Sequence, residues 1–202
     1  MKTTILLLAT IFLVASCSKN DDTPPAPLDQ LPAITTTGAN TAGCVIDGKV
    51  LIPKNGINSL SGSVSYGLET SRGVNFNNVP FGGDYFSIKF ANIKDKGKNY
   101  WIYIHLNNLK KGIGTYNVGQ SNGEFFNLAT NNPQIIVRET LDSVSGKTFI
   151  SGANSGSINI TRFDFNSLYN SIISGTFNAI LYNKDNLEEK IQVTEGRFDL
   201  KI

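Results

Sequence analysis

The residues whose side chains are best suited to binding or catalysis surround the only histidine of the chain, His105. Trp101, Tyr103 and His105 alternate with apolar residues, so in a β-strand all three side chains project from one face. A stripe of two aromatic rings and an imidazole could stack against sugar rings or another apolar ligand. The alternative, which we favour, is that this face forms the core of a β-sandwich, because aromatic side chains dominate cores. Trp101, Tyr103 and His105 are therefore a candidate ligand-binding set with a competing structural interpretation.

Catalytic and metal sites find little support in the sequence. A serine triad would depend on His105, for which a surface or half-buried position is the more ordinary interpretation. Neither a GxSxG, an HExxH, a phosphate-binding loop nor a CxxC pair occurs. Four carboxylates could pair for glycoside hydrolysis, but interleaved lysines indicate a solvated turn for most of them. They are Asp185, Glu188, Glu189 and Asp199. We assign no catalytic residue, no metal ligand and no cofactor.

Cys17 is predicted to carry lipid. It follows Lys2 and an apolar run at residues 5–15, which is shorter than the about 20 residues that span a bilayer. A positive start, a short apolar run and small residues before the cysteine are typical of an export signal. Residues 14–17, VASC, resemble the bacterial lipobox, which implies cleavage before Cys17 and acylation of its sulfur. Two or more acyl chains would hold the chain firmly to a membrane.

The second cysteine, Cys44, then has no partner for a disulfide within the chain. An exposed lone thiol is reactive in an oxidising compartment. We therefore expect Cys44 to be buried as a small apolar residue, with a reactive or dimer-forming thiol as the alternative.

The residues after Cys17 bear on location. Ser18 is not the Asp that keeps many lipoproteins at the inner membrane, so the resemblance implies the outer membrane. Lys19 followed by Asp21 and Asp22 resembles a short charged tag that sends some Bacteroidetes lipoproteins to the cell surface. A solvated tether would carry such charges as well. The periplasmic and the surface-exposed face both remain open.

A further modification is predicted at Ser143. The triplet Asp142-Ser143-Val144 resembles the acceptor for O-glycosylation in exported Bacteroidetes proteins. The N-glycosylation pattern that begins at Asn159 lies in a predicted strand and is interpreted as coincidence.

Charge argues against nucleic acid as a partner. The chain has 18 Lys and Arg against 16 Asp and Glu and no long basic run, whereas phosphate binding needs clustered positive charge. The membrane, through the lipid, and a carbohydrate or envelope protein are the partners that remain.

Composition divides the chain into three parts. Residues 1–16 are predicted to be the signal peptide. Residues 17–40 contain four prolines and few large apolar residues, which is typical of a disordered linker after the lipidated end. Residues 41–202 are long enough to form one domain with a substantial core.

Period-2 alternation dominates this domain. Asp47-Gly48 lies between two apolar runs, the strongest local signal for a two-residue hairpin. Near the C-terminus, residues 173–181 place apolar or small residues on one face, and residues 191–202 return with Gly196 as an expected bulge or close backbone approach. With residues 157–164 they predict a three-stranded antiparallel meander.

The predicted fold class is all-β, an antiparallel β-sandwich of about ten to twelve short strands. A lipocalin-like antiparallel barrel is the alternative, because the strand number fits both and closure is not readable from sequence.

Three segments resemble recurring motifs of uncharacterised Bacteroidetes lipoproteins, GANT-x-GC-x-x-DGK, ISGTF and VT-x-GRFDL. They are residues 38–53 (GANTAGCVIDGKVLIP), 172–177 (IISGTF) and 193–200 (VTEGRFDL). The chain departs from the family near Ala42 and Leu51, where an aromatic is expected, which argues against an aromatic ligand platform there. The resemblance implies no activity.

We therefore expect a lipid-anchored, non-enzymatic envelope protein that binds a ligand or partner. A hydrolase acting on glycans and a structural envelope component are the alternatives.

Overall fold

The computed structural model describes residues 30–57, 62–73, 85–94, 97–107, 109, 112–141, 144–164 and 171–202. The predicted lipid attachment at Cys17 and the predicted O-glycosylation at Ser143 lie outside these ranges.

Twelve strands make up about two thirds of the described residues, which confirms the all-β prediction. They are β1 (Thr41–Ile46), β2 (Lys49–Leu51), β3 (Gly56–Ile57), β4 (Val64–Ser65), β5 (Leu68–Arg72), β6 (Tyr85–Ala91), β7 (Lys98–Asn107), β8 (Gly114–Val118), β9 (Gln134–Leu141), β10 (Val144–Asp164), β11 (Ile172–Asn183) and β12 (Asn186–Lys201). A short 3-10 helix, η3 (Phe126–Leu128), lies between β8 and β9. In the residues that the structure describes, no helix combines the length and the apolar character needed to cross a membrane.

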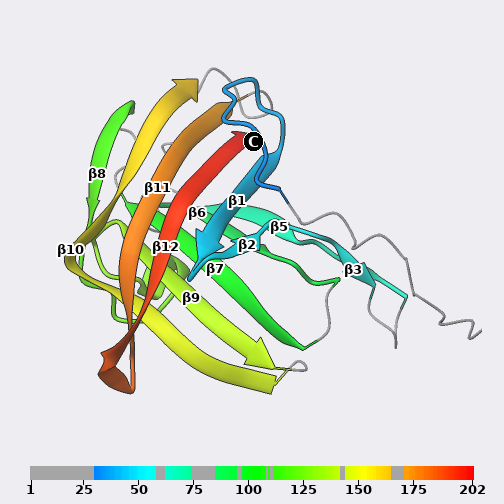
Figure 1. Ribbon diagram of the computed structural model, residues 1–202. Coiled ribbons are helices and arrows are strands. Elements are labelled where there is room, and N and C mark those ends of the chain that lie inside the picture. Colours follow the sequence, from blue (N-terminus) through cyan, green and yellow to red (C-terminus); the bar gives the residue numbers. More distant parts are fainter. Residues whose placement is uncertain are drawn as a thin grey trace, which may run out of the picture.

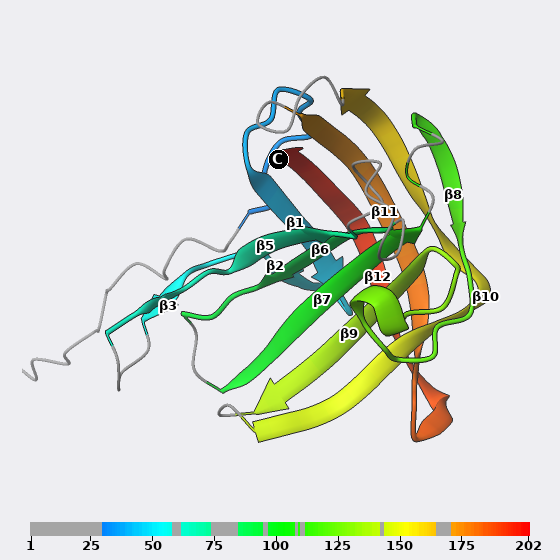
Figure 2. The same cartoon turned by 180° about the vertical axis from the view of Figure 1, so that it is seen from behind.

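Ten of the strands form one antiparallel sheet in the order β2-β1-β12-β11-β10-β9-β7-β6-β5, with β8 paired to β10. The sheet folds over on itself, so that β1, β12 and β11 face β6, β7 and β9 across the core (Figures 1 and 2). Phe177 on β11 meets Phe90 on β6 between these layers, with ring centroids 6.4 Å apart. This arrangement is compatible with a sandwich or an open barrel.

The long strand β10 connects the two layers, because it belongs to both. Its first part pairs with β9 and its second part, from Gly156, pairs with β8. The register with β11 shifts between Ser151 and Gly156, and Asn154 between them has a left-handed φ of 55°. The strand bends at this irregularity and carries the sheet from one layer to the other.

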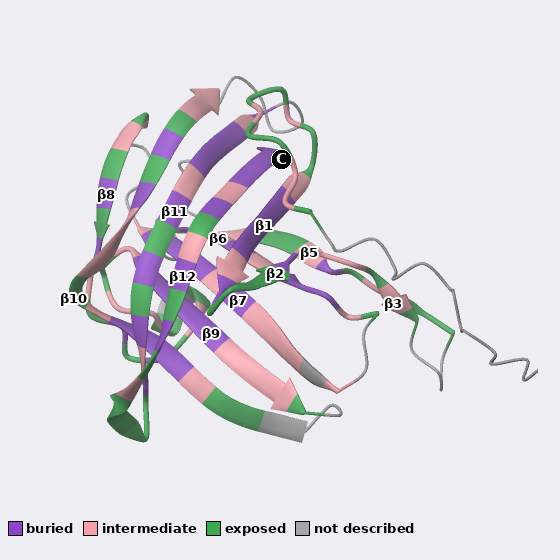
Figure 3. Ribbon diagram, viewed as in Figure 1, coloured by how far each residue is buried: buried purple, intermediate pink, exposed green. Residues whose placement is uncertain are grey.

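The predicted C-terminal meander is confirmed as β10, β11 and β12. Buried and exposed residues alternate along β11 and β12 (Figure 3). A Cβ on Gly196 would lie 2.5 Å from the Phe177 ring, which confirms the predicted close approach. The expectation of short strands is wrong here, because these three strands have 21, 12 and 16 residues. Bulges let a strand continue where the sequence pattern breaks.

The hairpin at Asp47-Gly48 is also confirmed. β1 and β2 pair up to Ile46 and Lys49, leaving a two-residue loop. Asp47 and Gly48 have φ values of 46° and 79°, the left-handed pair of a type I′ turn. Cys44, next to this turn, is fully buried in the core, as expected, and burial raises the pKa of its thiol far above the ordinary value.

The chain before β1 is bound to the sheet from about residue 31 onward. Arg197 donates a hydrogen bond to the Pro32 carbonyl (3.2 Å), and Lys201 N donates to Asn40 Oδ1 (2.9 Å). Arg162 also donates to the carbonyl of Thr36. Residues 31–40 therefore lie against the sheet, although composition assigns them to the linker. We call residues 31–40 the N-terminal strap.

Candidate functional site

The predicted stripe of Trp101, Tyr103 and His105 lies on one face of β7, as expected. Ile102, Ile104 and Leu106 point the other way and are fully buried in the main core. Trp101 and Tyr103 are half-buried and lie outside that core. The favoured interpretation, that the stripe belongs to the core of the sandwich, is therefore wrong. The outer face of the sheet carries it instead.

This outer face is covered by the segment that joins β8 to β9, residues 119–133. Phe125 packs on Tyr103 with ring centroids 4.2 Å apart, and Phe126 approaches Tyr85 at 6.4 Å. Tyr85 in turn stacks on His105 at 5.3 Å. Phe125 and Phe126 of the covering segment form a small aromatic cluster with the rings beneath them. The rings of the stripe therefore do not form an open platform.

Gln134, at the start of β9, holds the covering segment in place. Its side-chain amide donates to the carbonyl of Glu124 (2.9 Å) and its side-chain oxygen accepts from Thr130 (3.1 Å). Asn107 adds a hydrogen bond to the carbonyl of Asn131 (2.8 Å). Gln134 is 1% exposed, and a buried amide with partners for both ends fixes the backbone it touches.

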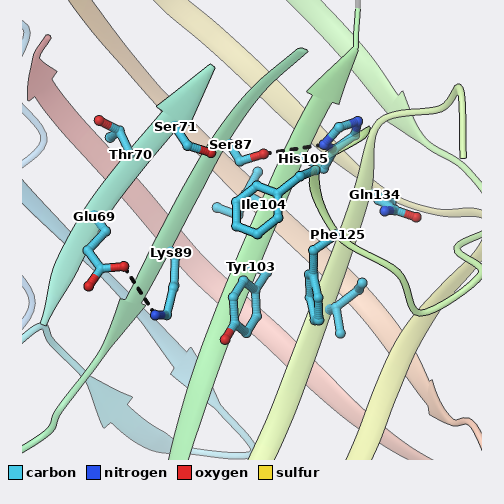
Figure 4. A pocket seen from close by; sticks show the side chains of 12 residues that line it. Glu69, Thr70, Ser71, Ser87, Lys89, Tyr103, Ile104, His105, Phe125 and Gln134 are labelled. Carbon is cyan, nitrogen blue, oxygen red and sulfur yellow. Dashed lines mark hydrogen bonds and ion pairs between the residues drawn. The ribbon is translucent and has the colours of Figure 1, made fainter. Parts of the chain in front are cut away.

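A cavity of about 100 Å³ remains between the covering segment and strands β5, β6, β7 and β9 (Figure 4). Its lining residues are Glu69, Thr70, Ser71, Ser87, Lys89, Tyr103, Ile104, His105, Phe125, Phe126, Gln134 and Ile136. Tyr103 and His105 of the predicted set line it. Trp101 does not.

One end of the cavity is polar and uncharged. Ser71, Ser87 and His105 lie side by side there (Figure 4). The Ser87 hydroxyl and His105 Nδ1 are 3.3 Å apart, and the tautomer decides which of them donates. The hydroxyl oxygen of Ser71 is buried and has no hydrogen-bond partner. A buried hydroxyl without a partner is rare in folded proteins.

Burial lowers the pKa of His105 to about 4. The imidazole is therefore neutral at neutral pH and offers one donor and one acceptor rather than a positive charge. Burial also favours the neutral form of Tyr103 and raises its pKa. The Arg138 guanidinium opposes this rise, and the Glu69 carboxylate adds to it. Both groups present uncharged surfaces to the cavity.

Charged groups lie at one side of the cavity. Lys89 forms an ion pair with Glu69 (3.1 Å), and its ammonium lies 4.3 Å from the centre of the Trp101 ring. Arg138 lies over the Phe125 ring at 5.2 Å. Since Lys89 covers Trp101 and Phe125 covers Tyr103, the chain's own side chains occupy the ring faces that a stacked ligand would need.

The arrangement does not resemble a hydrolytic site. Among the described residues, the contacts of His105 are with Ser87 and Tyr85 and none is with a carboxylate, so the imidazole lacks the acidic partner of a triad. The structure brings Asp199 together with none of the other three carboxylates. Glu189 binds Lys147 and Asn183 near the β11–β12 turn, where Asp185 and Glu188 are exposed. Within the described ranges, no group of three potential metal ligands occurs.

Asp199 has a structural role. It is 1% exposed, and it receives hydrogen bonds from the N-terminal strap and from β11. The donors are Thr35 Oγ1 (2.6 Å), Thr37 N (2.9 Å), Gly38 N (2.8 Å), Ala39 N (3.1 Å) and Ser174 Oγ (2.6 Å). Burial alone would raise the pKa of Asp199, but the hydrogen bonds outweigh it and hold this pKa well below the ordinary value.

Sequence reasoning missed several residues of the cavity. The adjacent pair Phe125-Phe126 in a polar segment was the available signal, because two large rings outside any strand need a surface to cover. Ser71 and Ser87 gave no signal, since serine is common on outer faces of strands.

The chain matches no protein-family model, no curated protein and no solved structure. The resemblance to Bacteroidetes lipoproteins therefore stays a prediction, and the cavity has to be interpreted from its own chemistry.

Proposed function

We propose that the protein is a lipid-anchored cell-envelope protein, held to the outer membrane through Cys17, whose β domain binds a ligand without chemical conversion. The ligand is an uncharged ring that carries a hydrogen-bonding group. The unpartnered hydroxyl of Ser71 inside an aromatic cavity carries this proposal.

The size of the cavity limits what can enter. Its 100 Å³ is smaller than the roughly 150 Å³ of a cavity that encloses benzene. Only the edge of one ring fits into the cavity, beside Tyr103 and Phe125. The rest of a larger ligand would remain outside, beside Lys89 and Glu69. A terminal sugar residue of a glycan and an aromatic alcohol both satisfy this requirement.

The polar end selects for neutral groups. Ser71 can both donate and accept, and His105 is neutral, so a ligand hydroxyl finds partners there. A carboxylate would lose its hydration without gaining an opposite charge at that end. We therefore expect a hydroxyl-bearing ring to bind more tightly than its carboxylate or its unsubstituted counterpart.

Trp101 allows a direct measurement, because it is the only tryptophan and its ring touches the Lys89 ammonium at the side of the cavity. Purified mature chain is titrated with p-cresol, toluene, p-toluate and a methyl hexoside while Trp101 fluorescence is recorded. We expect p-cresol or the hexoside to bind about 3- to 10-fold more tightly than toluene, the size of one hydrogen bond.

The variant Ser71→Ala should remove this preference while toluene binding is unchanged. Ser157→Ala, on β10, is the matched control and should keep the preference. Equal binding of toluene and p-cresol by the parent chain, or a preference that survives Ser71→Ala, would reject the proposed site.

Anchoring is tested separately in the native host. Cys17→Ser should release the protein from the membrane fraction, and protease treatment of intact cells should show which face it occupies. Retention of the Cys17→Ser chain in the membrane would reject the lipid anchor without bearing on the cavity.

A further inference from the structure

The two-stranded ribbon of β3 and β4 projects from the body of the molecule (Figures 1 and 2). Ile57 and Val64 are opposite each other in register, so their side chains share one face. Tyr66, two residues after Val64, falls on the same face. The three residues are 77%, 52% and 60% exposed. The ribbon therefore presents neighbouring apolar side chains to solvent, away from the core.

The base of this ribbon is fixed to the sheet. Lys54 N donates to the Ala91 carbonyl (3.1 Å), and Ile93 N donates to the Lys54 carbonyl (2.9 Å). Gly67, after β4, lies so close that a Cβ there would be 2.6 Å from the Lys54 backbone. The direction in which the apolar face points is thus set by the fold.

The N-terminal strap begins next to the strand that leads into the ribbon. A Cβ on Gly43 would lie 3.0 Å from Leu31, 3.1 Å from Pro32 and 3.2 Å from the carbonyl oxygen of Leu51. β3 begins five residues after Leu51, a span of at most about 17 Å. Leu31, from which the chain continues towards Cys17, therefore lies in the same region of the molecule as the base of the ribbon.

Charge in this region suits an anionic surface. Residues 48–68, which include the ribbon, contain Lys49 and Lys54 but no Asp or Glu. Lys94, next to Ile93 at the ribbon base, is exposed. A tyrosine beside apolar side chains, with lysines nearby, is the composition found where proteins touch the headgroup region of a bilayer.

We propose that the apolar face of Ile57, Val64 and Tyr66 lies in the headgroup region of the lipid bilayer to which the chain is anchored. This proposal rests on the lipid anchor of the proposed function and adds an orientation to it. The 13 residues from 18 to 30 reach at most about 45 Å, so an anchored domain cannot move far from the membrane. Tethering makes the contact effectively intramolecular, and a contact too weak to recruit a free protein is then sufficient.

In the test, the full mature chain is attached chemically to lipid vesicles, so the outcome does not depend on whether cells acylate Cys17. The Cys17 thiol is coupled to a maleimide lipid in vesicles of phosphatidylcholine and phosphatidylglycerol. Cys44 does not compete, because it is fully buried. In a Trp101→Phe background, Tyr66→Trp places a fluorescent probe on the ribbon. Leu187→Trp places the control probe on the far hairpin, where Leu187 is 66% exposed.

Brominated phosphatidylcholine should quench the probe at position 66 at least about twofold more than the probe at position 187. Adding Ile57→Ser and Val64→Ser should abolish this difference, and so should omission of the coupling. Equal quenching at the two positions would overturn the proposal. So would a probe at position 66 that changes its emission only with protein concentration, since the face would then contact a second copy or another protein.

Discussion

Two buried polar groups, the Asp199 carboxylate and the Ser71 hydroxyl, differ in how completely the chain satisfies them. Asp199 receives amide and hydroxyl hydrogen bonds from the N-terminal strap and from β11. The Ser71 oxygen receives and donates none. Both groups lie on strands of the same sheet, so general features of the fold do not explain the difference.

The comparison separates a structural role from a binding role. A buried group with all its partners strengthens the native state, because removing it leaves donors unsatisfied. A buried group without partners weakens the native state and gains free energy only when something else supplies the hydrogen bond. By this criterion Asp199 stabilises the fold, and Ser71 is the observation on which the proposed ligand site rests.

The largest effect is expected for Asp199→Ala. Several donors lose their acceptor at once, and we expect the free energy of unfolding to fall by about 3 kcal/mol or more. Urea titration of the mature chain measures this directly. The N-terminal strap should also become accessible to protease, since Asp199 binds the strap at Thr35, Thr37, Gly38 and Ala39.

Asp185→Ala is the matched control, because Asp185 is exposed at the β11–β12 turn. Its cost should be within about 0.5 kcal/mol. If both variants unfold at the same urea concentration, the Asp199 carboxylate does not stabilise the fold.

The pH dependence of stability distinguishes the same two regions. His105 has a folded pKa of about 4 against an ordinary value of 6.5. Between these values the unfolded chain takes up a proton and the folded chain does not, so stability is lost as pH falls through that window. The loss is at most about 3 kcal/mol, and it is complete near pH 4. Unfolding titrations across this range measure it, and His105→Gln should flatten it.

The contribution of Asp199 to stability changes at lower pH than that of His105. Its pKa is depressed in the folded state, so its contribution is present above the unfolded pKa of about 3.9 and is lost as pH falls towards the folded value. His105→Gln should leave this acid loss intact, whereas Asp199→Ala should remove it. A single variant that removes both losses would show that the two regions unfold as a coupled unit.

The fold was largely predictable, because its signals are local. Period-2 alternation located β7, β11 and β12, and the Asp47-Gly48 pair located a turn. Each of these patterns lies within about twenty residues, where strand geometry relates spacing to side-chain direction. The same geometry placed Trp101, Tyr103 and His105 on one face.

The site was less predictable, because it depends on contacts between distant segments. Alternation gives two faces for β7 but does not say which one meets the core, and aromatic content pointed to the wrong one. The cover by Phe125, and the strap that reaches Asp199 from more than 150 residues away, leave no periodic signal. Proline content suggested a linker for residues that in fact bind the sheet.

The smallest effects come from two serines that differ only in their partners. Ser174 Oγ donates to Asp199 Oδ1 at 2.6 Å, whereas Ser71 Oγ has no partner. Ser174→Ala should lower the free energy of unfolding by about 1–2 kcal/mol, because the carboxylate loses one donor. Ser71→Ala should change it by less than about 0.5 kcal/mol, or raise it, because no hydrogen bond is lost and an unsatisfied oxygen is removed. Urea titrations of both variants, with and without p-cresol, measure these two changes in the free energy of unfolding. A Ser71→Ala cost equal to that of Ser174→Ala would mean that water or the chain already satisfies the Ser71 hydroxyl, and the cavity would then lose the feature that singles it out as a binding site.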